Sequence, residues 1–260
     1  MKISVVLPCY NASNNIIETL DSINRQTLQQ IECVIINDGS TDNTHDLIVS
    51  YKFREGISVI YISRENKGFL FSLQEGIDRS SNELIARIDS DDIWEPNHLE
   101  LLSSVLEKEN LVFVGSNATL INDKGDEIGF FNVPTTNKML LKRLLNDNAI
   151  IHSSVIFRKD IYYKTSGYIC GEGDFYKHIA DYNLWVEMSV WGRCRNVQER
   201  TVRYRYLDNS MSRSINRLTN YKARRHVMLK MFRFHKTDTL FFIKSLIKVE
   251  LRIIQSLLCR

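Results

Sequence analysis

The 260-residue sequence contains no CxxC pair, although it has five cysteines. They are Cys9, Cys33, Cys170, Cys194 and Cys259. Without close pairs, the cysteines do not indicate a disulfide framework. Two of them fall in apolar runs that are predicted to be buried strands, so we expect reduced thiols, as in a cytosolic protein.

Long uncharged apolar segments are also absent. The N-terminal residues MKISVVLPCYN have no long apolar segment ahead of a cleavage site, so we expect no signal peptide. No stretch reaches the roughly 18 uncharged apolar residues of a membrane-spanning helix. We find no internal repeat and no low-complexity linker. These absences favour a folded cytoplasmic protein.

Acidic and basic residues are divided unevenly along the chain. A hydrophobic content of 43% and a charged content of 25% are ordinary for a globular protein. Residues 1–199 contain 19 Lys and Arg against 28 Asp and Glu, whereas residues 200–260 contain 15 against 3. The net charges of −9 and +12 together give the +3 of the whole chain. This asymmetry predicts that the C-terminal quarter faces something anionic.

Strand and helix patterns alternate four times over the first 110 residues. Short β-rich apolar runs predict strands, and between them apolar residues recur at helical spacing, as Ile16, Leu20 and Ile23 do. The expected strands are 3–7, stopped by Pro8, then 31–36, 57–62 and 84–88. The expected helices are one capped by Ser13 or Asn14, one at 42–51, one through Phe71 and Ile77, and one from Pro96 to about Glu109. The alternation indicates a parallel, doubly wound α/β sheet.

The rhythm changes beyond residue 110. The segments 111–115, 118–121 and 150–157 resemble strands, and a turn at NDKGD separates Ile121 from Ile128. Helical spacing predicts a short helix at 138–145 and another at 181–191, and residues 194–206 are expected to be extended. From residue 215 the chain is predicted to form two basic helices, broken near 236–239.

Three carboxylates lie within four residues where the fourth strand should end: Asp89, Asp91 and Asp92. In a parallel sheet this position is at the carboxyl end of a strand, where open α/β sheets bind ligands. Acids this close repel one another unless a cation or donor groups compensate their charge. Mg²⁺ is commonly held by one or two carboxylates and the phosphates of a substrate. The stretch therefore predicts either a metal–diphosphate site or a solvated acidic turn ahead of the next helix.

Six motifs, in order, resemble the family 2 glycosyltransferases, inverting enzymes with the GT-A fold. They are SVVLPCYNAS, ETLDSINRQT, ECVIINDGSTDNT, NKG, ARIDSDD and ADYNLW. The resemblance covers residues 1–210, implying a nucleotide-sugar-binding half at 1–110, an acceptor-binding half at 111–210 and a helical tail at 211–260. It favours the metal-site interpretation of the acidic stretch, with Mg²⁺ or Mn²⁺ as the ion.

The resemblance also implies roles for individual residues of the donor site. They are Pro8 and Tyr10 in the first nucleotide-binding loop, Asp38 on the edge of the base, Lys67 at the diphosphate, Asp89 near the ribose and the metal, Asp91 as the main metal ligand, and Asp92 at the donor sugar. A carboxylate at Asp38 would accept the N3–H of uracil. The alternatives are that Asp38 closes an Asx-turn and that Lys67 is a solvated loop lysine.

On the acceptor side, the resemblance implies that Asp181 is the general base that takes the proton of the acceptor hydroxyl. The alternative is an N-cap of the helix that follows. The family usually has an acid before the base, where this chain has Ala180. The alternatives are that Asp174 or Glu172 substitutes for it and that the base has a different pKa. The family often has a histidine where this chain has Leu207; His152 is in a family-like place but is also explained as a core histidine.

We weigh three classes of function. The first is a metal-dependent glycosyltransferase that uses a nucleotide sugar, UDP-linked, and a glycan or lipid-linked acceptor in the synthesis of O-antigen, capsule or lipooligosaccharide. The second is a sugar nucleotidyltransferase, but the loop PCYNASNN lacks the glycines usual in that class. The third is an inactive membrane-associated partner protein, for which Ala180 is the main support.

The basic tail has two interpretations. Ile243, Leu246, Ile247, Ile254, Leu257 and Leu258 fall near helical spacing, with Lys244, Lys248 and Arg252 on another face. This is the composition of an amphipathic helix that lies on an anionic membrane. The alternative is a helix that packs on the catalytic domain or on a second copy, giving a homodimer. Nucleic acid is not an expected partner, because no binding module is recognised.

Overall fold

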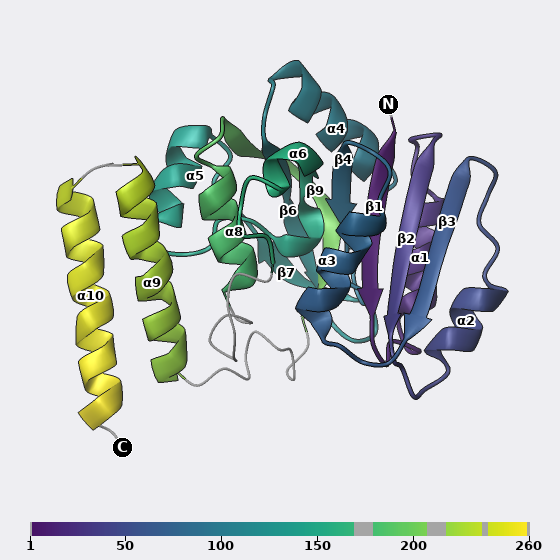
Figure 1. Ribbon diagram of the computed structural model, residues 1–260, viewed down its shortest axis with the longest axis horizontal. Helices are drawn as coiled ribbons and strands as arrows, with labels where there is room; N and C mark the ends of the chain where they lie inside the picture. The colour runs from purple at the N-terminus through teal and green to yellow at the C-terminus, as the bar shows by residue number, and fades with distance from the viewer. Residues whose placement is uncertain (1, 169–178, 207–216, 236–238, 259–260) are drawn as a thin grey trace.

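A computed structural model describes residues 2–168, 179–206, 217–235 and 239–258. Its first half has four parallel strands in the spatial order β3-β2-β1-β4 (Figure 1). They are β1 (Ile3–Cys9), β2 (Ile31–Asp38), β3 (Ile57–Arg64) and β4 (Leu84–Arg87). Ile3 of the central strand pairs with Ile31 on one side and Leu84 on the other. The predicted parallel arrangement is confirmed, and the carboxyl ends of these strands lie along one edge of the sheet.

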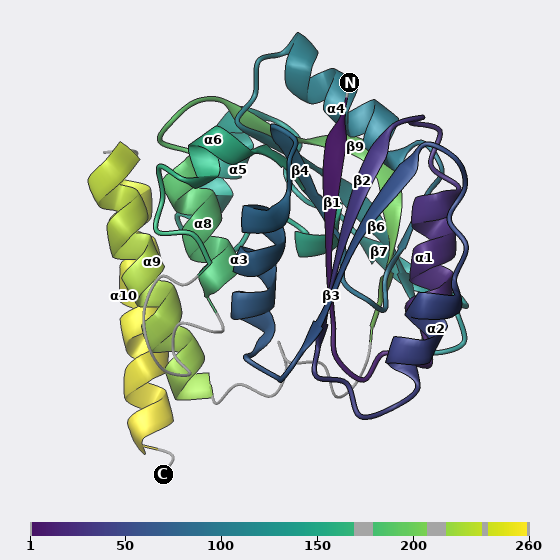
Figure 2. The same cartoon turned by 45° about the vertical axis from the view of Figure 1, so that its right-hand side comes forward.

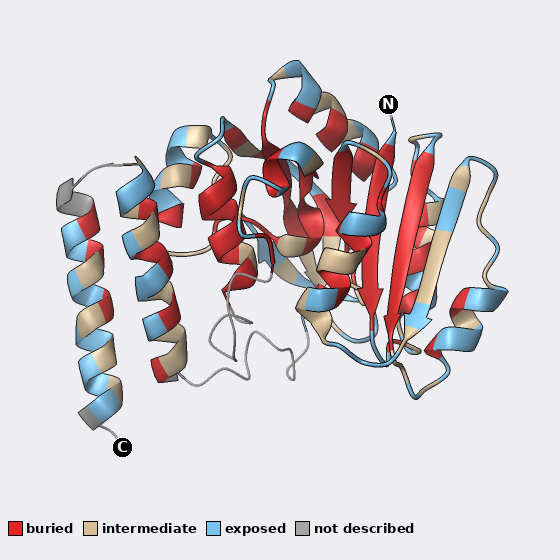
Figure 3. Cartoon of the chain, viewed as in Figure 1, coloured by how far each residue is buried: buried red, intermediate tan, exposed pale blue. Residues whose placement is uncertain are grey.

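Helices cover both faces of this parallel half (Figure 2). They are α1 (Ile16–Asn24), α2 (Thr44–Ser50) and α4 (His98–Lys108) on one face and α3 (Phe69–Arg79) on the other. The side chains of β1 alternate accordingly. Ile3, Val5 and Leu7 share one apolar core with α1 and α4, whereas Val6 packs with Leu73 of α3 in a second core. Both cores lie against the strands, which are buried throughout in β1 and β2 (Figure 3).

A glycine permits the close approach of α3 to the sheet. A Cβ atom added at Gly76 would lie 2.5 Å from Cγ1 of Val6, so either Val6 or α3 would have to shift to make room for it. A larger residue at this position would therefore disturb the packing of α3 on β1.

The second half of the sheet is mixed. Its strands are β5 (Ile93–Trp94), β6 (Phe113–Ile121), β7 (Glu127–Phe131), β8 (Ile156–Arg158) and β9 (Cys194–Arg205). β8 joins the halves, because it pairs antiparallel with both β4 and β6. β6 also pairs parallel with the long β9 and antiparallel with β7. The helical elements of this half are α5 (Asn137–Leu144), a 3-10 turn (His152–Ser154), α6 (Lys159–Tyr162) and α8 (Ala180–Met188).

Several predicted boundaries are wrong, for identifiable reasons. Pro8 does not stop β1, because it pairs with Ile36 of β2. The missing N–H of proline costs no hydrogen bond here, since it would point toward β4, whose pairing with β1 ends at Val6. The N-cap of α1 is Asn15, which makes no side-chain capping hydrogen bond, instead of Ser13 or Asn14.

Two strands also differ from the sequence prediction. The run 150–157 is not one strand, because the backbone turns at His152–Ser154 and only the end of the run pairs with β4 and β6. Conversely, residues 113–115 of the first predicted run and the whole run 118–121 belong to the single strand β6, whose pairing with β9 is irregular between Gly115 and Ala118.

The C-terminal part forms two antiparallel helices, α9 (Arg217–His235) and α10 (Thr239–Leu258). α9 lies between α8 and α10 (Figure 1). Lys230 of α9 bonds Asn183 at 2.8 Å and pairs with Glu187, both on α8, while Phe232 stacks on Phe242 of α10 at 4.0 Å between ring centroids. No helix in the described part of the chain is long and apolar enough to cross a membrane.

Three of the cysteines lie in strands and have free, buried thiols: Cys9 in β1, Cys33 in β2 and Cys194 in β9. Burial, with the nearby negative charges of Asp38 and Asp42, raises the pKa of Cys9 to about 12. Burial also raises the pKa of Cys33 to about 12. The prediction of reduced thiols holds for these three; Cys170 and Cys259 lie outside the described residues.

Candidate active site

The loops after β1 and β2 are tied together by side-chain hydrogen bonds. The backbone N–H of Thr41 donates to the side chain of Asn11 at 2.8 Å, and that of Ala12 donates to the Thr44 hydroxyl at 2.8 Å. The Asp42 carboxylate accepts from the backbone of Ser13 at 3.0 Å. Burial alone would raise the pKa of Asp42, but hydrogen bonds from Thr44 and Ser13 outweigh it and lower that pKa to about 2. The two loops therefore form one unit at the edge of the sheet.

This unit positions the first predicted nucleotide contacts. Pro8 is buried within β1, and the ring of Tyr10, two residues further, is 52% exposed above the loop. A half-exposed tyrosine has ring surface that a planar ligand can contact. The predicted base-stacking role of Tyr10 stays a prediction.

Asp38, at the end of β2, is buried and holds the loop after β3. Its carboxylate accepts from the backbone N–H groups of Lys67 at 2.8 Å and Gly68 at 2.9 Å, and pairs with Arg64. The alternative, that Asp38 only caps the turn after β2, is not what the structure has: its neighbour Asn37 caps this turn, and the Asn37 side chain accepts from the backbone of Ser40 at 3.1 Å. Gly39 lies between Asp38 and Ser40, at φ +75. It has no room for a Cβ atom, which would lie 2.6 Å from the backbone nitrogen of Asn66.

The loop held by Asp38 carries Lys67. Its side chain is exposed, and its ammonium lies 5.0 Å from the centroid of the Phe71 ring. Arg64, which sequence reasoning missed, also lies against Phe71 at 5.1 Å and bonds Glu75 at 2.7 Å. Two cations thus stand at the start of α3, beside the end of β2.

Asp89 follows β4 and pairs with Arg87 through both carboxylate oxygens, one contact being 2.7 Å. The hydroxyl of Ser153 donates to the same carboxylate at 3.1 Å and accepts from the backbone of Asp89 at 3.1 Å. Arg87 is fully buried, whereas the Asp89 side chain is 28% exposed. Asp89, a predicted site residue, is therefore partly exposed at the site, and the buried guanidinium of Arg87 holds its carboxylate from below.

Asp91 and Asp92 lie in the turn before β5 and have no cation of this kind. Burial, then repulsion from Asp89, raises the pKa of Asp91 to about 6. Asp92 is buried; one of its carboxylate oxygens accepts from the backbone of Arg205 at 2.8 Å. The other has no partner among the described residues. Burial and the charges of Asp91 and Asp89 raise the pKa of Asp92 well above its ordinary range.

Arg205, at the end of β9, closes this turn from behind. Its guanidinium bonds the backbone carbonyl of Asp91 at 2.9 Å and the carboxylate of Glu18 in α1 at 2.6 Å. Two further bonds reach the carbonyls of Asn122 and Asp123, at 2.9 and 2.8 Å. The guanidinium contacts Asp91 through its backbone carbonyl, so it does not pair with the Asp91 carboxylate.

The acidic turn fits a divalent cation in part. Across residues 2–168, 179–206, 217–235 and 239–258, no three His, Cys, Asp or Glu side chains form a preformed metal cluster. However, among the described residues no side chain donates to the Asp91 carboxylate, and burial, with repulsion between these neighbouring acids, raises the pKa of both Asp91 and Asp92. Carboxylate oxygens suit Mg²⁺ and Mn²⁺, and one or two are enough where phosphates complete the shell. Asp91 and Asp89 are the residues that would hold such an ion.

Asp181 comes from the other half of the sheet, in the first turn of α8. The Asn148 side chain donates to its carboxylate at 2.8 Å, and the backbone of Tyr182 donates at 2.7 Å. The alternative N-cap role is wrong, because the N-cap of α8 is Ile179. Burial raises the pKa of Asp181, hydrogen bonds and the charge of Arg87 oppose that shift, and the charge of Asp89 adds to it. Asp181 therefore shares one electrostatic environment with Arg87 and Asp89.

The departures from the family pattern lie around Asp181. Ala180 is buried in the apolar core beneath α8. Glu172, Asp174 and Leu207 lie outside the described residues. His152 hydrogen-bonds the Tyr168 hydroxyl at 2.7 Å and contacts the rings of Phe69 and Trp185. Burial lowers its pKa well below the ordinary value, so His152 is a neutral, partly buried histidine that is hydrogen-bonded to Tyr168.

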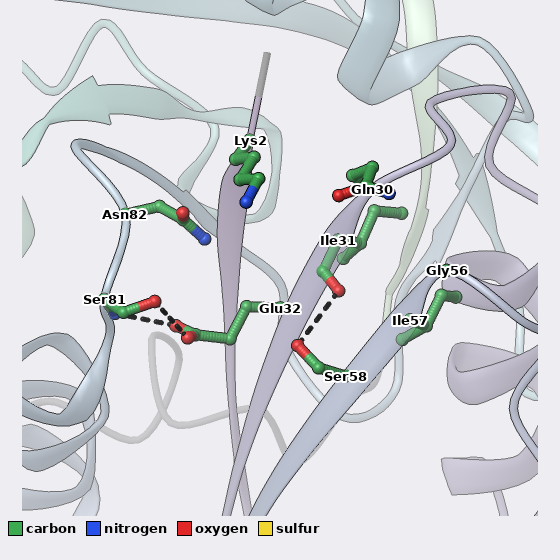
Figure 4. A pocket seen from close by; sticks show the side chains of 9 residues that line it. All are labelled: Lys2, Gln30, Ile31, Glu32, Gly56, Ile57, Ser58, Ser81 and Asn82. Carbon is green, nitrogen blue, oxygen red and sulfur yellow. Dashed lines mark hydrogen bonds between the residues drawn. The ribbon is translucent and has the colours of Figure 1, made fainter.

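The hollows at the amino-terminal ends of the strands lie apart from these acids. A pocket of about 380 Å³ lies against β1, β2 and β3, and Glu32 within it bonds Ser81 (Figure 4). A larger groove of about 1130 Å³ lies between Glu109, Arg158 and Trp191. Both are at the edge opposite to Asp38 and Asp89, so neither is the candidate active site.

The sequence of the chain is similar to those of known glycosyltransferases. The sequence model of "Glycosyl transferase family 2" matches residues 4–165. An uncharacterized glycosyltransferase of Haemophilus influenzae is 30% identical over 232 residues, 86% of this chain and 71% of the relative. The O-antigen biosynthesis glycosyltransferase WbnJ of Escherichia coli is 29% identical over 258 residues, 95% of this chain and 97% of the relative.

Two solved structures have the same fold. S. aureus TarS 1-349 in complex with UDP-GlcNAc matches with a TM-score of 0.70 at 16% identity, over 97% of this chain and 72% of that one. The mannosyltransferase PcManGT of Pyrobaculum calidifontis, in complex with GDP-Man and Mn²⁺, matches with a TM-score of 0.63 at 15% identity, over 98% and 72%. At these identities the likeness shows the fold alone, which is GT-A as predicted.

Proposed function

The chain belongs to glycosyl transferase family 2, and on that premise we propose that it is an inverting, metal-dependent enzyme that transfers a sugar from a UDP-linked donor. The observation that supports the proposal is that each half of the sheet holds one carboxylate by side-chain hydrogen bonds: Arg87 and Ser153 bond Asp89, and Asn148 bonds Asp181. In this proposal the donor-side acid and the base candidate from the other half serve one reaction centre. In this proposal residues 1–110 bind the donor and residues 111–210 bind the acceptor.

On the donor side, the uracil base stacks on Tyr10 beside Pro8 and bonds Asp38. One oxygen of Asp38 accepts only from Gly68 among the described residues, so it retains a lone pair for the N3–H of the base. Lys67, exposed at the start of α3, compensates the charge of the diphosphate. In this proposal Asp89 accepts a ribose hydroxyl, and Asp92, one oxygen of which has no partner among the described residues, serves the donor sugar.

A Mg²⁺ or Mn²⁺ ion held by Asp91, with Asp89, would neutralise negative charge on the leaving diphosphate. The chain supports this role by leaving the Asp91 carboxylate without a cationic partner while fixing its backbone through Arg205. The Mn²⁺ named with PcManGT agrees with such an ion. Arg87 has the complementary task, because it fixes the orientation of Asp89 from within the core.

Asp181 acts as the general base. The acceptor hydroxyl oxygen forms a bond to the anomeric carbon of the donor sugar while the bond from that carbon to the diphosphate oxygen breaks. The hydroxyl proton passes to the Asp181 carboxylate, and the diphosphate leaves with the bonding electrons. Attack from the side opposite to the leaving group inverts the anomeric carbon. The raised pKa of Asp181 favours this step, since a more basic carboxylate takes a proton more readily.

The acceptor is a hydroxyl of a glycan or of a lipid-linked glycan used for surface polysaccharide, on the cytoplasmic side of the membrane. The relative named as an O-antigen biosynthesis glycosyltransferase supports this choice, because the match extends over nearly the whole of both chains. The donor sugar is a hexose or an N-acetylhexosamine; UDP-GlcNAc, named with TarS, is the first to test.

The decisive experiment measures UDP release from a panel of UDP-hexoses and UDP-N-acetylhexosamines with Mn²⁺, with and without lipid-linked glycan acceptors. We expect release from one donor that rises with one acceptor and stops in EDTA. Thermal-shift titration with the same donors runs in parallel. If no donor shifts the melting temperature and none is consumed, the chain is an inactive partner protein.

A further inference from the structure

Helix α10 has two apolar faces, and one of them is uncovered. Its inner face packs toward α9 through the buried side chains of Phe242, Ser245 and Val249. Its outer face carries a row of five side chains that are each between 46% and 54% exposed: Ile243, Ile247, Leu251, Ile254 and Leu257. We call this row the apolar stripe. Steps of three and four residues place them on one side of the helix. In Figure 3 exposed residues recur along the described part of α10, between buried and intermediate ones.

A row of cations runs beside the apolar stripe. Lys244, Lys248 and Arg252 follow one another at intervals of four residues and are exposed. Among the described residues, Lys244 and Lys248 form no ion pair, and Arg252 lies 5.7 Å from the centroid of the Tyr221 ring. The acid of α10, Glu250, is already paired with Arg225 of α9.

The other side of the stripe also borders on basic residues. A groove between α9 and α10 is lined by Lys222, Arg225, His226 and Leu229 of α9 and by Glu250 and Ile253 of α10. Arg225 and Glu250 pair with each other, and Asp147 pairs with Arg224. This side of the stripe therefore adds the charge of Lys222 and, among the described residues, no unpaired acid.

We propose that the apolar stripe binds the surface of an anionic phospholipid bilayer, with α10 lying flat in the interface. The stripe would enter the boundary between headgroups and acyl chains, and Lys244, Lys248 and Arg252 would lie at the level of the lipid phosphates. The surface is on α10, beyond α9 and α8, so it is separate from the donor site and does not depend on the proposed reaction.

The charges favour a lipid surface over a second copy of the chain. A two-fold contact between identical stripes would bring the flanking cations of both copies together. Like charges across an interface oppose association, and α10 offers the second copy no free carboxylate. An anionic bilayer would instead attract these cations through its phosphates and bury the apolar side chains among its acyl chains.

The experiment is sedimentation of the full chain with vesicles of phosphatidylcholine alone or with phosphatidylglycerol, at low and high salt. Two variants change exposed residues only: Lys244→Gln with Lys248→Gln, and Ile247→Ser with Leu251→Ser. The matched controls are Lys52→Gln with Lys108→Gln, which remove two exposed lysines far from α10, and Val49→Ser, which removes an exposed apolar side chain of α2. Far-UV circular dichroism and light scattering accompany every sample.

We expect the parent chain and both controls to bind the anionic vesicles at low salt and to be released at high salt. The lysine variant should bind about 20- to 30-fold more weakly, as expected for about 1 kcal/mol per basic residue. The serine variant should lose binding altogether. Absence of binding by the parent chain, or unchanged binding by both variants, would overturn the proposal. So would a dimer that the serine variant converts to a monomer, because a second copy would then occupy the stripe.

Discussion

The Arg87 guanidinium holds the Asp89 carboxylate with both of its terminal nitrogens, although the two residues differ greatly in exposure. Arg87 is fully buried and Asp89 is 28% exposed on the site side. Removing either partner leaves the other charge without its ion pair. Water can then solvate the partly exposed Asp89 carboxylate, but it cannot reach the buried Arg87 guanidinium.

This asymmetry predicts the order of two stability losses. Asp89→Asn should lower the free energy of unfolding by about 3–5 kcal/mol, the usual cost of a buried charge without its partner. Arg87→Met should cost less, about 1–3 kcal/mol, because water and Ser153 still solvate Asp89. Urea denaturation measures both. The double variant should lose less than the sum of the two, and a reversed order would contradict the buried-cation account.

The metal assignment predicts that Asp91→Asn folds normally and loses turnover. Removing the main metal ligand forfeits several kcal/mol of charge stabilisation, so UDP release should fall by about 10³-fold. The comparison is with Asp46→Asn, an exposed carboxylate of α2. Steady-state assays over a range of Mn²⁺ concentrations give the result. Full activity of the parent chain in EDTA would remove Asp91 from this role.

The base assignment predicts a particular pH profile. Because burial raises the pKa of Asp181, this carboxylate takes up a proton at a higher pH than an ordinary aspartate. Above that pKa the base is ionised and kcat is constant; as the pH falls through it, kcat should decline with the gain of one proton. Asp181→Asn should lower kcat by about 10²–10⁴-fold and abolish this limb of the profile.

The matched variant for Asp181 is Asp160→Asn, which removes an exposed carboxylate of α6 and should leave the profile unchanged. The donor affinity of Asp181→Asn, measured by calorimetry with UDP, should equal that of the parent chain. A weaker UDP affinity would instead assign Asp181 to the donor site.

The position of Asp38 predicts a loss of nucleotide affinity. In Asp38→Asn the neutral side chain would hold the N–H groups of Lys67 and Gly68 less strongly and would no longer pair with Arg64. Hydrogen bonds to a charged group contribute about 1.5–3 kcal/mol each, so the Kd for UDP should rise at least about tenfold. Calorimetry gives the value. An unchanged Kd would mean that Asp38 serves only the loop.

The parallel half and the acids at its edge follow from local patterns. Apolar runs alternate with helical spacing, and Asp38 and Asp89 stand in sequence directly where those runs end, so strand direction alone brings them together. Arg87 also left a local signal. It stands two residues before Asp89, which in a strand places both side chains on one face. The signal was missed because arginine is rarely buried.

The rest of the site depends on contacts that no local pattern encodes. Arg205 bonds the carbonyl of Asp91 across a separation of 114 residues, and Asn148 bonds Asp181 across 33. The turn at residues 152–154 has a similar origin. Its Ser153 bonds Asp89, and its carbonyl accepts from the indole of Trp94 at 2.7 Å, so tertiary bonds replaced the strand that the apolar run predicted.

The reactivity of the three buried thiols reports local unfolding of the sheet. Cys9 and Cys33 lie in the parallel half of the sheet and Cys194 in the mixed half, and the raised pKa values keep them protonated and unreactive in the folded state. An alkylating reagent added to the native protein therefore modifies each thiol only when its strand leaves the sheet. The order in which the three are labelled distinguishes fraying of one half from cooperative unfolding of both, without any introduced probe.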